Sequence, residues 1–265
     1  MSQEHREWNS EIYHQISEPQ FRWGNRVLSW LSLRGDETVL DAGCGTGRVT
    51  AELLNLLPRG RVVASDISEN MLRTAREHLQ PRFADRIAFV AADSQFLPFD
   101  RAFDGVFSTA SFHWVRDHDR LFRSVFQALK SGGWLCAQCG GYGNVRRLMA
   151  RVAELIAAQP ALAKYLGNYV LPWEFASAET AAERLRRAGF VDIHTAIIED
   201  DATFDTAGEY KQFLATVVLR THVERIPEAE VREKFLEALV HRSAADKPPF
   251  QLDYHRLNLR AHRPA

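Results

Sequence analysis

The sequence predicts an α/β fold in which a doubly wound sheet of seven mostly parallel strands carries helices on both faces, with a helical cap formed by insertions. The first observation is an alternation, over two-thirds of the 265 residues, between short β-rich runs and stretches of amphipathic helical spacing. The second is a glycine-rich turn that leaves the first of these runs and enters a helix. The third is a pair of helical segments that interrupt the alternation. Because 46% of the residues are apolar and 25% are charged, a packed core is expected.

The seven expected strands are short runs in which apolar and β-branched residues dominate. They lie at residues 38–41, 61–66, 87–92, 103–108, 134–139, 191–197 and 252–261. Helical spacing of apolar residues occurs before and between them, at 23–33, 49–57, 71–79, 121–129 and 181–188. Ser68 is expected to cap the helix that follows it, and Gly189 to end the last of these helices. The final strand is expected to be antiparallel to its neighbour.

Two segments with helical spacing, 144–172 and 206–243, fall outside this alternation. We expect them to pack together over the carboxyl ends of the strands, where open α/β sheets hold their ligands. The predicted division is therefore a ligand-binding core and its cap. The core is expected to comprise 1–141, with an N-terminal lid helix, 176–204 and the last strand at 249–265, and the cap to comprise the insertions 142–175 and 205–248.

Charge and hydropathy set limits on the partners of the chain. The formal net charge of −1 gives no reason to expect a nucleic-acid partner, since such proteins usually carry a basic excess or stripe. Apolar runs stay well below the ~18 residues that a membrane-spanning helix needs, so no membrane partner is expected. The polar N-terminal stretch lacks the apolar segment of a secretory signal, which favours a cytoplasmic protein. We therefore expect a monomer or homodimer that acts on a small molecule.

The three cysteines predict neither a disulfide scaffold nor a metal site. Cys136 and Cys139 form a C-x-x-C pair inside an apolar run that predicts a strand. Residues three apart on a strand face opposite sides, and no second Cys or His pair lies at ligand spacing. We therefore expect two core cysteines and no bound metal.

The run Val39-Leu-Asp-Ala-Gly-Cys-Gly-Thr-Gly47 carries the main chemical signal. Its glycines permit a tight turn and a close approach of the backbone to a ligand. A dinucleotide site requires G-x-G-x-x-G, whereas here the spacing is G-x-G-x-G, with Arg48 in place of the third glycine. Asp41 precedes the turn, and a carboxylate there would repel a pyrophosphate and attract an ammonium or sulfonium group. The turn therefore favours a cationic amino-acid ligand.

Acidic residues also end the second and third expected strands. Asp66 could accept both hydroxyls of a ribose, with the apolar Ile67 and Met71 beside the base. Asp93 and Ser94 could bind the polar edge of an adenine. An aspartate at a strand end is also a common turn or cap residue. Three aspartates at three successive strand ends, in this order, are not expected by chance and favour the ligand interpretation.

These runs together resemble the class I S-adenosylmethionine (SAM)-dependent methyltransferases. The residues that carry the resemblance are VLDAGCGTG, VVASDIS, FVAADSQFLPF, FDGVFSTASFHWV and SGGWLCAQ, within residues 10–140. The helical insertions and the tryptophan after the fourth strand are similar to the trans-aconitate 2-methyltransferase-like small-molecule methyltransferases. The resemblance implies a Rossmann-like methyltransferase fold, SAM as cofactor and S-adenosylhomocysteine as product.

The resemblance also implies the residues that hold the cofactor. The methionine end would lie on Asp41 and the glycine turn, the ribose on Asp66, and the adenine among the residues that follow the second and third strands. The full expected set is Tyr13, Asp41, Gly43, Gly45, Gly47, Asp66, Ile67, Met71, Asp93, Ser94 and Thr109.

The acceptor side is less defined by sequence. His113 is the candidate general base for a hydroxyl or acidic carbon, while a carboxylate acceptor needs no base. The other interpretation of His113 is a structural histidine bonded to loop backbone, and the trans-aconitate relatives tend to have an uncharged amide there. Trp114 could form a wall of the acceptor pocket or pack the sheet. Arg220 could bind a carboxylate or lie solvated on the surface.

Two other functions stay open at this stage. An NAD(P)-dependent oxidoreductase would share the sheet, although Arg48 and the Asp93–Ser94 pair speak against it. A non-catalytic SAM-binding protein would use the same cofactor residues. The favoured reaction is methyl transfer by in-line displacement to an oxygen, carboxylate or hydroxyl, of a small-molecule acceptor, in preference to a carbon.

Overall fold

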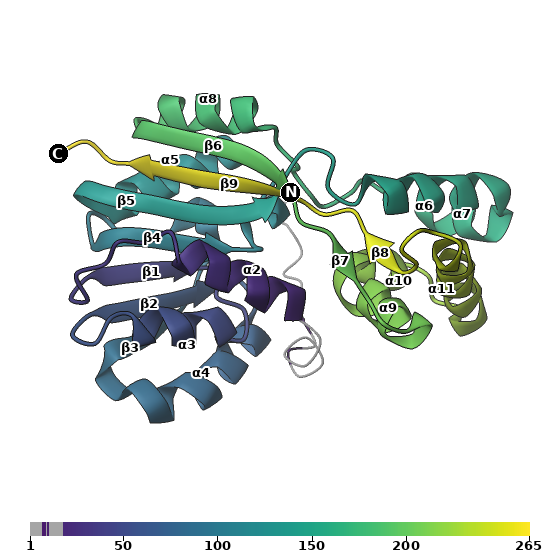
Figure 1. Ribbon diagram of the computed structural model, residues 1–265, viewed down its shortest axis with the longest axis horizontal. Helices are drawn as coiled ribbons and strands as arrows, with labels where there is room; N and C mark the ends of the chain where they lie inside the picture. The colour runs from purple at the N-terminus through teal and green to yellow at the C-terminus, as the bar shows by residue number, and fades with distance from the viewer. Residues whose placement is uncertain (1–6, 9, 11–17) are drawn as a thin grey trace. The chain divides into compact units, whose positions relative to one another are not determined.

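A computed structural model describes residues 7, 8, 10 and 18–265 of the chain (Figure 1). The chain forms two compact units. The first, here called the core unit, comprises Met1–Tyr142, Pro172–Ile198 and Arg256–Ala265. The second, here called the helical unit, comprises Gly143–Leu171 and Glu199–His255.

The core unit is built on the seven-stranded sheet that the sequence predicts. The strands lie in the order β3-β2-β1-β4-β5-β9-β6 (Figure 1). They are β1 (Thr38–Ala42), β2 (Arg61–Asp66), β3 (Ile87–Ala91), β4 (Phe103–Thr109), β5 (Leu129–Gly140), β6 (Val191–Glu199) and β9 (His255–His262). Strands β1 to β5 pair in parallel and β9 pairs antiparallel with β5, which confirms the mostly parallel doubly wound sheet. The strand order changes direction between β1 and β4, the topological switch point at which such sheets bind ligands.

Helices cover the two faces of this sheet. They are α2 (Glu18–Leu28), α3 (Arg48–Asn55), α4 (Glu69–Phe83), α5 (His118–Ala128) and α8 (Ala178–Ala188), with short turns η1 (Ala84–Arg86), η2 (Ser94–Phe96) and η3 (Phe112–Trp114). Neighbouring residues of a strand point to opposite faces, so Val39 packs with α2, α3 and α4 while Leu40 packs with α5 and α8. The Ser68 hydroxyl accepts the N–H of Met71 and caps α4, and Gly189 ends α8 in the left-handed conformation, as predicted.

The two central cysteines belong to these cores. Cys136 lies in the apolar cluster on one face of the sheet and Cys139 in the cluster on the other. Burial raises the pKa of each thiol to about 12. Both are free cysteines inside β5, in agreement with the strand interpretation of the C-x-x-C pair.

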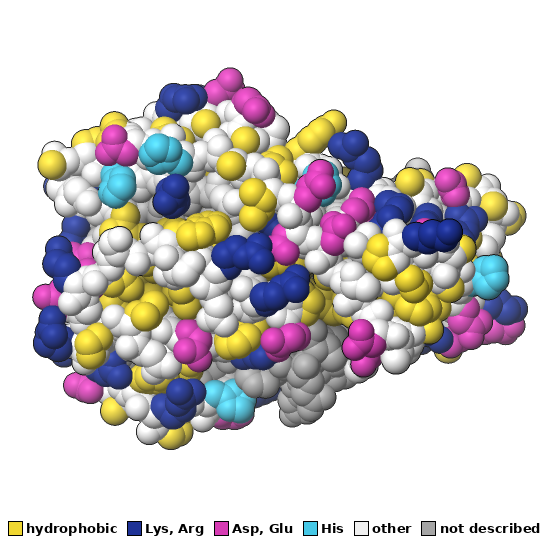
Figure 2. Space-filling view, viewed as in Figure 1, with side chains coloured by type: hydrophobic (Ala, Val, Ile, Leu, Met, Phe, Trp, Pro, Cys, Tyr) yellow, Lys and Arg dark blue, Asp and Glu magenta, His cyan; other side chains and the backbone are white. Residues whose placement is uncertain are grey.

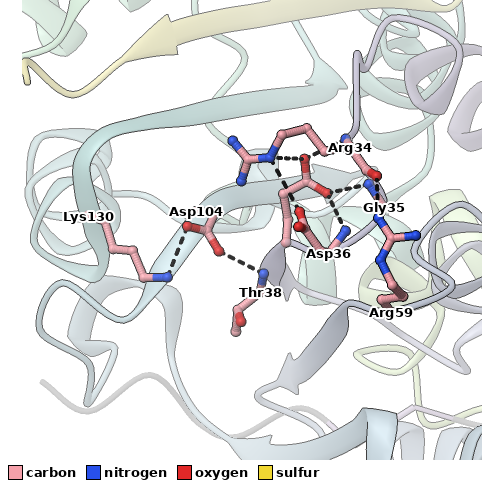
Figure 3. A network of polar contacts seen from close by, with 8 residues as sticks. Arg34, Gly35, Asp36, Thr38, Arg59, Asp104 and Lys130 are labelled. Atoms are coloured by element: carbon pink, nitrogen blue, oxygen red, sulfur yellow. Dashed lines mark hydrogen bonds and ion pairs between the residues drawn. The ribbon is translucent and has the colours of Figure 1, made fainter.

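A polar network fixes the chain where it enters β1 (Figure 3). The buried Glu37 carboxylate accepts N–H groups of the preceding turn, the shortest at 2.7 Å from Arg34. Asp104 accepts the N–H of Thr38 at 2.8 Å and the ammonium of Lys130 at 2.9 Å. Burial alone would raise the pKa of Asp104, but these donors hold it below its ordinary value. Because β1 leads directly into the glycine turn, this network positions the turn.

The helical unit contains α6 (Arg146–Ala158), α7 (Pro160–Leu166), α9 (Ala207–Phe213), the π-helical turn η4 (Leu214–Val218), α10 (Arg220–Val223) and α11 (Ala229–Ala244). Strand β7 (Ala202–Thr203) pairs antiparallel with β8 (Gln251–Leu252). Leu252 thus belongs to this short ribbon, and the last strand of the sheet begins at His255 instead of residue 252. Arg151 binds Asp246 through two bonds of 2.6 and 2.9 Å and joins α6 to the end of α11. A role of these helices as a cap stays a prediction.

Acidic and basic side chains are interspersed over the face of the molecule drawn in Figure 2. Among the described residues, no helix is both long enough and apolar enough to cross a membrane.

Candidate active site

A cavity in the core unit opens at the switch point of the sheet. Its walls come from the segments that follow β1, β2 and β4, together with described residues of the N-terminal segment and α2. The residues predicted for the cofactor that line it are Asp41, Gly43, Gly45, Asp66, Ile67, Met71 and Thr109. The structure therefore brings most of the expected cofactor set into one cavity.

The three glycines of the turn have different structural roles. All three have positive φ angles, 80° at Gly43, 55° at Gly45 and 80° at Gly47. A Cβ at Gly45 would meet no atom within 4 Å, so the turn presents bare backbone there. A Cβ at Gly47 would lie 2.7 Å from a methyl group of Leu79, because α3 and α4 pack closely at that point. Gly47 is not among the lining residues and packs against α4, and a cofactor contact stays a prediction for it.

Asp41 is a buried carboxylate on the wall of the cavity. Its Oδ2 accepts the hydroxyl of Thr50 at 2.6 Å. Burial, with a smaller contribution from the negative charge of Asp66, raises the pKa of Asp41 to about 7. A positive group in the cavity would stabilise the ionised form, so this position suits a cationic ligand.

Asp66 is fixed by the backbone on both sides of it. One carboxylate oxygen accepts the N–H of Gly45 and the other that of Ser68, each at 2.9 Å. Burial raises the pKa of Asp66 even though these bonds oppose the shift. A carboxylate offers about four lone-pair sites, so Asp66 can still accept from a ligand hydroxyl beside its backbone donors, which include Ile67. Ile67 and Met71 line the same cavity and add apolar surface beside it.

Asp93 and Ser94 lie at the start of η2 and are not among the residues that line the cavity. Asp93 accepts the backbone N–H of Gln95 at 2.9 Å, and the Gln95 amide reaches both of its carboxylate oxygens at 3.2 and 3.1 Å. The carboxylate is thus engaged within its own turn. A contact with an adenine edge stays a prediction for this pair.

The N-terminal segment contributes residues that the sequence interpretation missed. Trp8, on this segment, lines the cavity together with Phe21 and Arg48. Glu7 accepts the hydroxyl of Ser68 at 2.9 Å and the N–H groups that begin α4, and so ties the segment to that helix. No periodicity in the polar N-terminus indicates these contacts, because each joins residues far apart in sequence. Tyr13, predicted to help close the site, lies outside the described residues.

His113 lies on η3, directly after β4. Its Nδ1 accepts the N–H of Gly140, the last residue of β5, at 3.3 Å. Burial, then the positive charge of Arg256 and the nearby His118, lowers the pKa of His113 well below its usual value. The ring is therefore neutral at pH 7, and its proton lies on Nε2 because Nδ1 acts as the acceptor.

The η3 turn is held by a partly buried network of polar contacts. The ring of His118, at the start of α5, bonds the Phe112 carbonyl at 3.0 Å, and burial lowers its pKa. The N–H of Glu174 donates to the carbonyl of His113 at 2.9 Å. The Glu174 carboxylate in turn accepts a 2.7 Å bond from Arg184 of α8. These contacts fix the backbone that carries the two candidate acceptor residues.

Trp114 lines the cavity, and its role as a wall of the acceptor pocket stays a prediction. Arg220 lies in the helical unit, where its guanidinium binds Glu224 at 2.7 Å. A carboxylate-binding role for Arg220 stays a prediction. Among the described residues, no group of three or more His, Cys, Asp or Glu side chains could hold a metal ion.

The fold and the cavity together define a class of protein. A Rossmann-like sheet with a glycine turn, a carboxylate before that turn and a second carboxylate at the end of β2 is the arrangement of class I methyltransferases, as the sequence resemblance implies. A family model described as a methyltransferase domain matches residues 39–133, which include the turn and both carboxylates.

Comparison with known proteins agrees with this assignment. Over 163 residues the chain is 34% identical to a trans-aconitate 2-methyltransferase of Variovorax paradoxus, covering 61% of this chain and 60% of that protein. It is 29% identical over 235 residues to the trans-aconitate 2-methyltransferase of Delftia acidovorans, covering 84% of each. The structure of a Haemonchus contortus phosphoethanolamine N-methyltransferase 2 in complex with SAM superimposes with a TM-score of 0.62 at 19% identity, covering 97% of this chain and 57% of that one. The matched domain and these relatives support a class I SAM-dependent methyltransferase.

The residues of the cavity fit SAM as the cofactor. The sulfonium and ammonium groups of SAM are cationic, and Asp41 is a buried carboxylate with a raised pKa. The ribose offers two hydroxyls, and Asp66 has lone pairs to accept them. A dinucleotide fits less well, because the pyrophosphate would meet the charge of Asp41.

Proposed function

We propose that the protein transfers the methyl group of SAM to a carboxylate oxygen of a small organic acid. When bound, SAM supplies a methyl group that is already activated on a sulfonium. The protein then has to hold the cofactor, align the acceptor oxygen with the methyl carbon and exclude water. The two relatives named for trans-aconitate support an acid as the acceptor class.

The observation that carries the choice of a carboxylate is the state of His113. Its Nδ1 is engaged by the N–H of Gly140, and its low pKa makes it a weak proton acceptor at pH 7. The remaining ring nitrogen is a donor. A hydroxyl or carbon acceptor would have to lose its proton to a base, whereas a carboxylate is ionised already and needs only a hydrogen-bond donor. His113 suits the second task better than the first.

The cofactor residues have the following proposed roles. Asp41 faces the positive groups of the methionine end, and the backbone at Gly43, Gly45 and Thr109 approaches the same end. Asp66 accepts the ribose hydroxyls. The apolar surface for the adenine comes from the two residues Ile67 and Met71, which line the cavity beside Asp66.

The direct test is a screen with methyl-labelled SAM against three acceptor classes: carboxylic acids, phenols and amines. We expect label in the carboxylic acids. Mild alkali releases labelled methanol from a methyl ester but not from a methyl ether or an N-methyl amine, so the product chemistry identifies the acceptor atom. Label that is stable to alkali in every product would rule out a carboxylate acceptor.

A matched pair of variants tests the role of His113. His113→Asn keeps a donor and an acceptor but cannot take up a proton, and we expect turnover within about fivefold of the wild type. His113→Leu removes the donor, and we expect a loss of about tenfold to a hundredfold in kcat/KM for the acid. If His113 were a general base, both variants would be equally inactive, because neither side chain can take up a proton. Unchanged SAM affinity in both variants is the control for folding.

A further inference from the structure

Aromatic rings cluster around His113, the candidate hydrogen-bond donor. We call this cluster the aromatic wall; it consists of the rings of Trp8, His113, Trp114, Trp173 and Phe175, all of which belong to the core unit. Adjacent ring centroids lie between 5.4 and 5.8 Å apart. Each of the five side chains is only partly buried. Partial burial leaves some of each side chain in contact with solvent, so a ligand can reach the cluster.

The aromatic wall is continuous with the cofactor cavity. Trp8 and Trp114 contact each other edge to face at 5.4 Å, and both also line the cavity beside the glycine turn. Trp114 then contacts Trp173 at 5.8 Å, and Trp173 stacks on Phe175 at 5.4 Å. The wall therefore extends from the cavity to the ring of His113, which lies 5.8 Å from that of Phe175.

The segment that carries the outer rings is rigidly attached. Glu174 lies between Trp173 and Phe175, and its N–H bonds the carbonyl of His113. Its carboxylate is held by Arg184 at 2.7 Å. The outer rings and the donor thus keep a fixed spacing, as a preorganised binding surface requires.

The charges around the cavity limit the number of negative groups an acceptor can carry. Among the described lining residues, Arg48 is the one cationic side chain, and it binds Glu18 at 2.9 Å and stacks on Phe21 at 4.5 Å. Two carboxylates, Asp41 and Asp66, line the same cavity. A bound sulfonium compound offsets part of this negative charge. His113 itself is not among the lining residues, and the positive charge of Arg256, which reaches its ring, favours one acceptor carboxylate there. A single further carboxylate can be tolerated there, whereas several would be repelled.

We propose that the acceptor is an aromatic monocarboxylate, with its ring on the aromatic wall and its carboxylate at the Nε2–H of His113. This inference rests on the proposed carboxylate methylation and adds the substrate class. Flat π-systems make favourable edge-to-face and offset contacts with such rings, and a conjugated acid presents the flat face that the wall can bind.

The test uses a pair of ligands of equal charge and similar size. trans-Cinnamate is aromatic, and 3-cyclohexylpropanoate has the same carbon skeleton without the π-electrons of the ring and the double bond. Binding is measured by calorimetry and tryptophan fluorescence on the full chain saturated with S-adenosylhomocysteine. We expect cinnamate to bind about tenfold more tightly than 3-cyclohexylpropanoate and than trans-aconitate. Equal or tighter binding of either comparison ligand overturns the proposal.

Two variants assign the effect to the aromatic wall. Trp173→Leu removes an outer ring, and we expect about tenfold weaker cinnamate binding with unchanged affinity for S-adenosylhomocysteine. Phe126→Leu is the control, because Phe126 is also partly buried and contacts Phe190 at 5.1 Å, away from the cavity lining. A variant effect that is equal for cinnamate and 3-cyclohexylpropanoate would make the wall a packing feature and overturn the inference.

The methylation screen separates the two proposals. Alkali-labile label in aliphatic acids but not in aromatic acids leaves the proposed function standing and overturns the aromatic preference. Label only in phenols or amines overturns the proposed function itself. Alkali-labile label in cinnamate-like acids above all others supports both.

Discussion

The carboxylate of Asp41 gives the most quantitative prediction. Replacing it in the variant Asp41→Asn removes the charge and little else, because the amide oxygen can still accept the hydroxyl of Thr50, now 2.6 Å from Oδ2. We expect this variant to be more stable than the wild type in the absence of cofactor at pH 8. The reason is that the folded protein holds an ionised carboxylate that burial disfavours.

The magnitude follows from the raised pKa. Burial moves the pKa of Asp41 from 3.8 to about 7. A shift of roughly three units corresponds to at most ~4 kcal/mol at 1.36 kcal/mol per unit. Since the folded pKa is the higher one, the folded state binds the proton more tightly. The destabilisation of the folded protein by the ionised Asp41 carboxylate is therefore absent below about pH 4. It grows as the pH rises and is complete above about pH 7.

The assay is urea unfolding of the apo protein, followed by circular dichroism, at pH 5.5 and pH 8. We expect the free energy of unfolding of Asp41→Asn to be ~1–4 kcal/mol above that of the wild type at pH 8. At pH 5.5 this difference should be smaller by ~2 kcal/mol. SAM affinity, measured by calorimetry, should fall by about tenfold to a hundredfold in the variant, because a charge-assisted contact is lost. A variant that is less stable than the wild type at both pH values, or that binds SAM normally, would refute the reasoning.

Three further predictions concern neighbouring positions. Asp66→Ala should reduce SAM affinity at least tenfold while the far-ultraviolet dichroism of the fold stays unchanged, and normal affinity would remove the ribose assignment. Gly47→Ala should lower the free energy of unfolding by ~1–3 kcal/mol, because a Cβ would lie 2.7 Å from Leu79 at a φ of 80°; Gly45→Ala, at a φ of 55° with open space around it, is the control that separates backbone strain from the clash. Asp104→Asn should lower stability by ~1 kcal/mol at pH 7. The wild-type advantage over Asp104→Asn should vanish as the pH falls below about 4, because the folded pKa of Asp104 is the lower one; an advantage that persists there would exclude the ionised carboxylate as its source.

Local patterns in the sequence predict the part of the site that lies close together in the chain. The run from Val39 to Gly47 passes from a strand to a turn to a helix within nine positions, and Asp41, Gly43 and Gly45 line the cavity. The cap of α4 at Ser68 is equally local. In both cases the residues that determine the conformation lie within one turn of the residues they position.

Contacts between distant segments leave no such pattern. The sequence predicts one strand over 252–261, but pairing with Ala202 puts Leu252 in β8 of the helical unit. Trp8 lines the cavity from a polar segment with no periodicity. The bond between Gly140 and His113 joins the end of β5 to the turn η3 that follows the neighbouring strand β4. Propensity and spacing carry no information about pairings of this kind.

Burial acts in opposite directions on the two key titrating groups, and this gives the activity a defined pH dependence. It raises the pKa of Asp41 to about 7, and it lowers the pKa of His113, which is therefore neutral across the same range. If Asp41 holds the cofactor and His113 donates a hydrogen bond, kcat/KM for SAM should rise with pH and level off above about pH 7. The kcat at saturating SAM should stay flat, because no group on the acceptor side changes its charge there. A general base in the same pH range would instead place a rising limb on kcat, so the two profiles distinguish the mechanisms without any substitution.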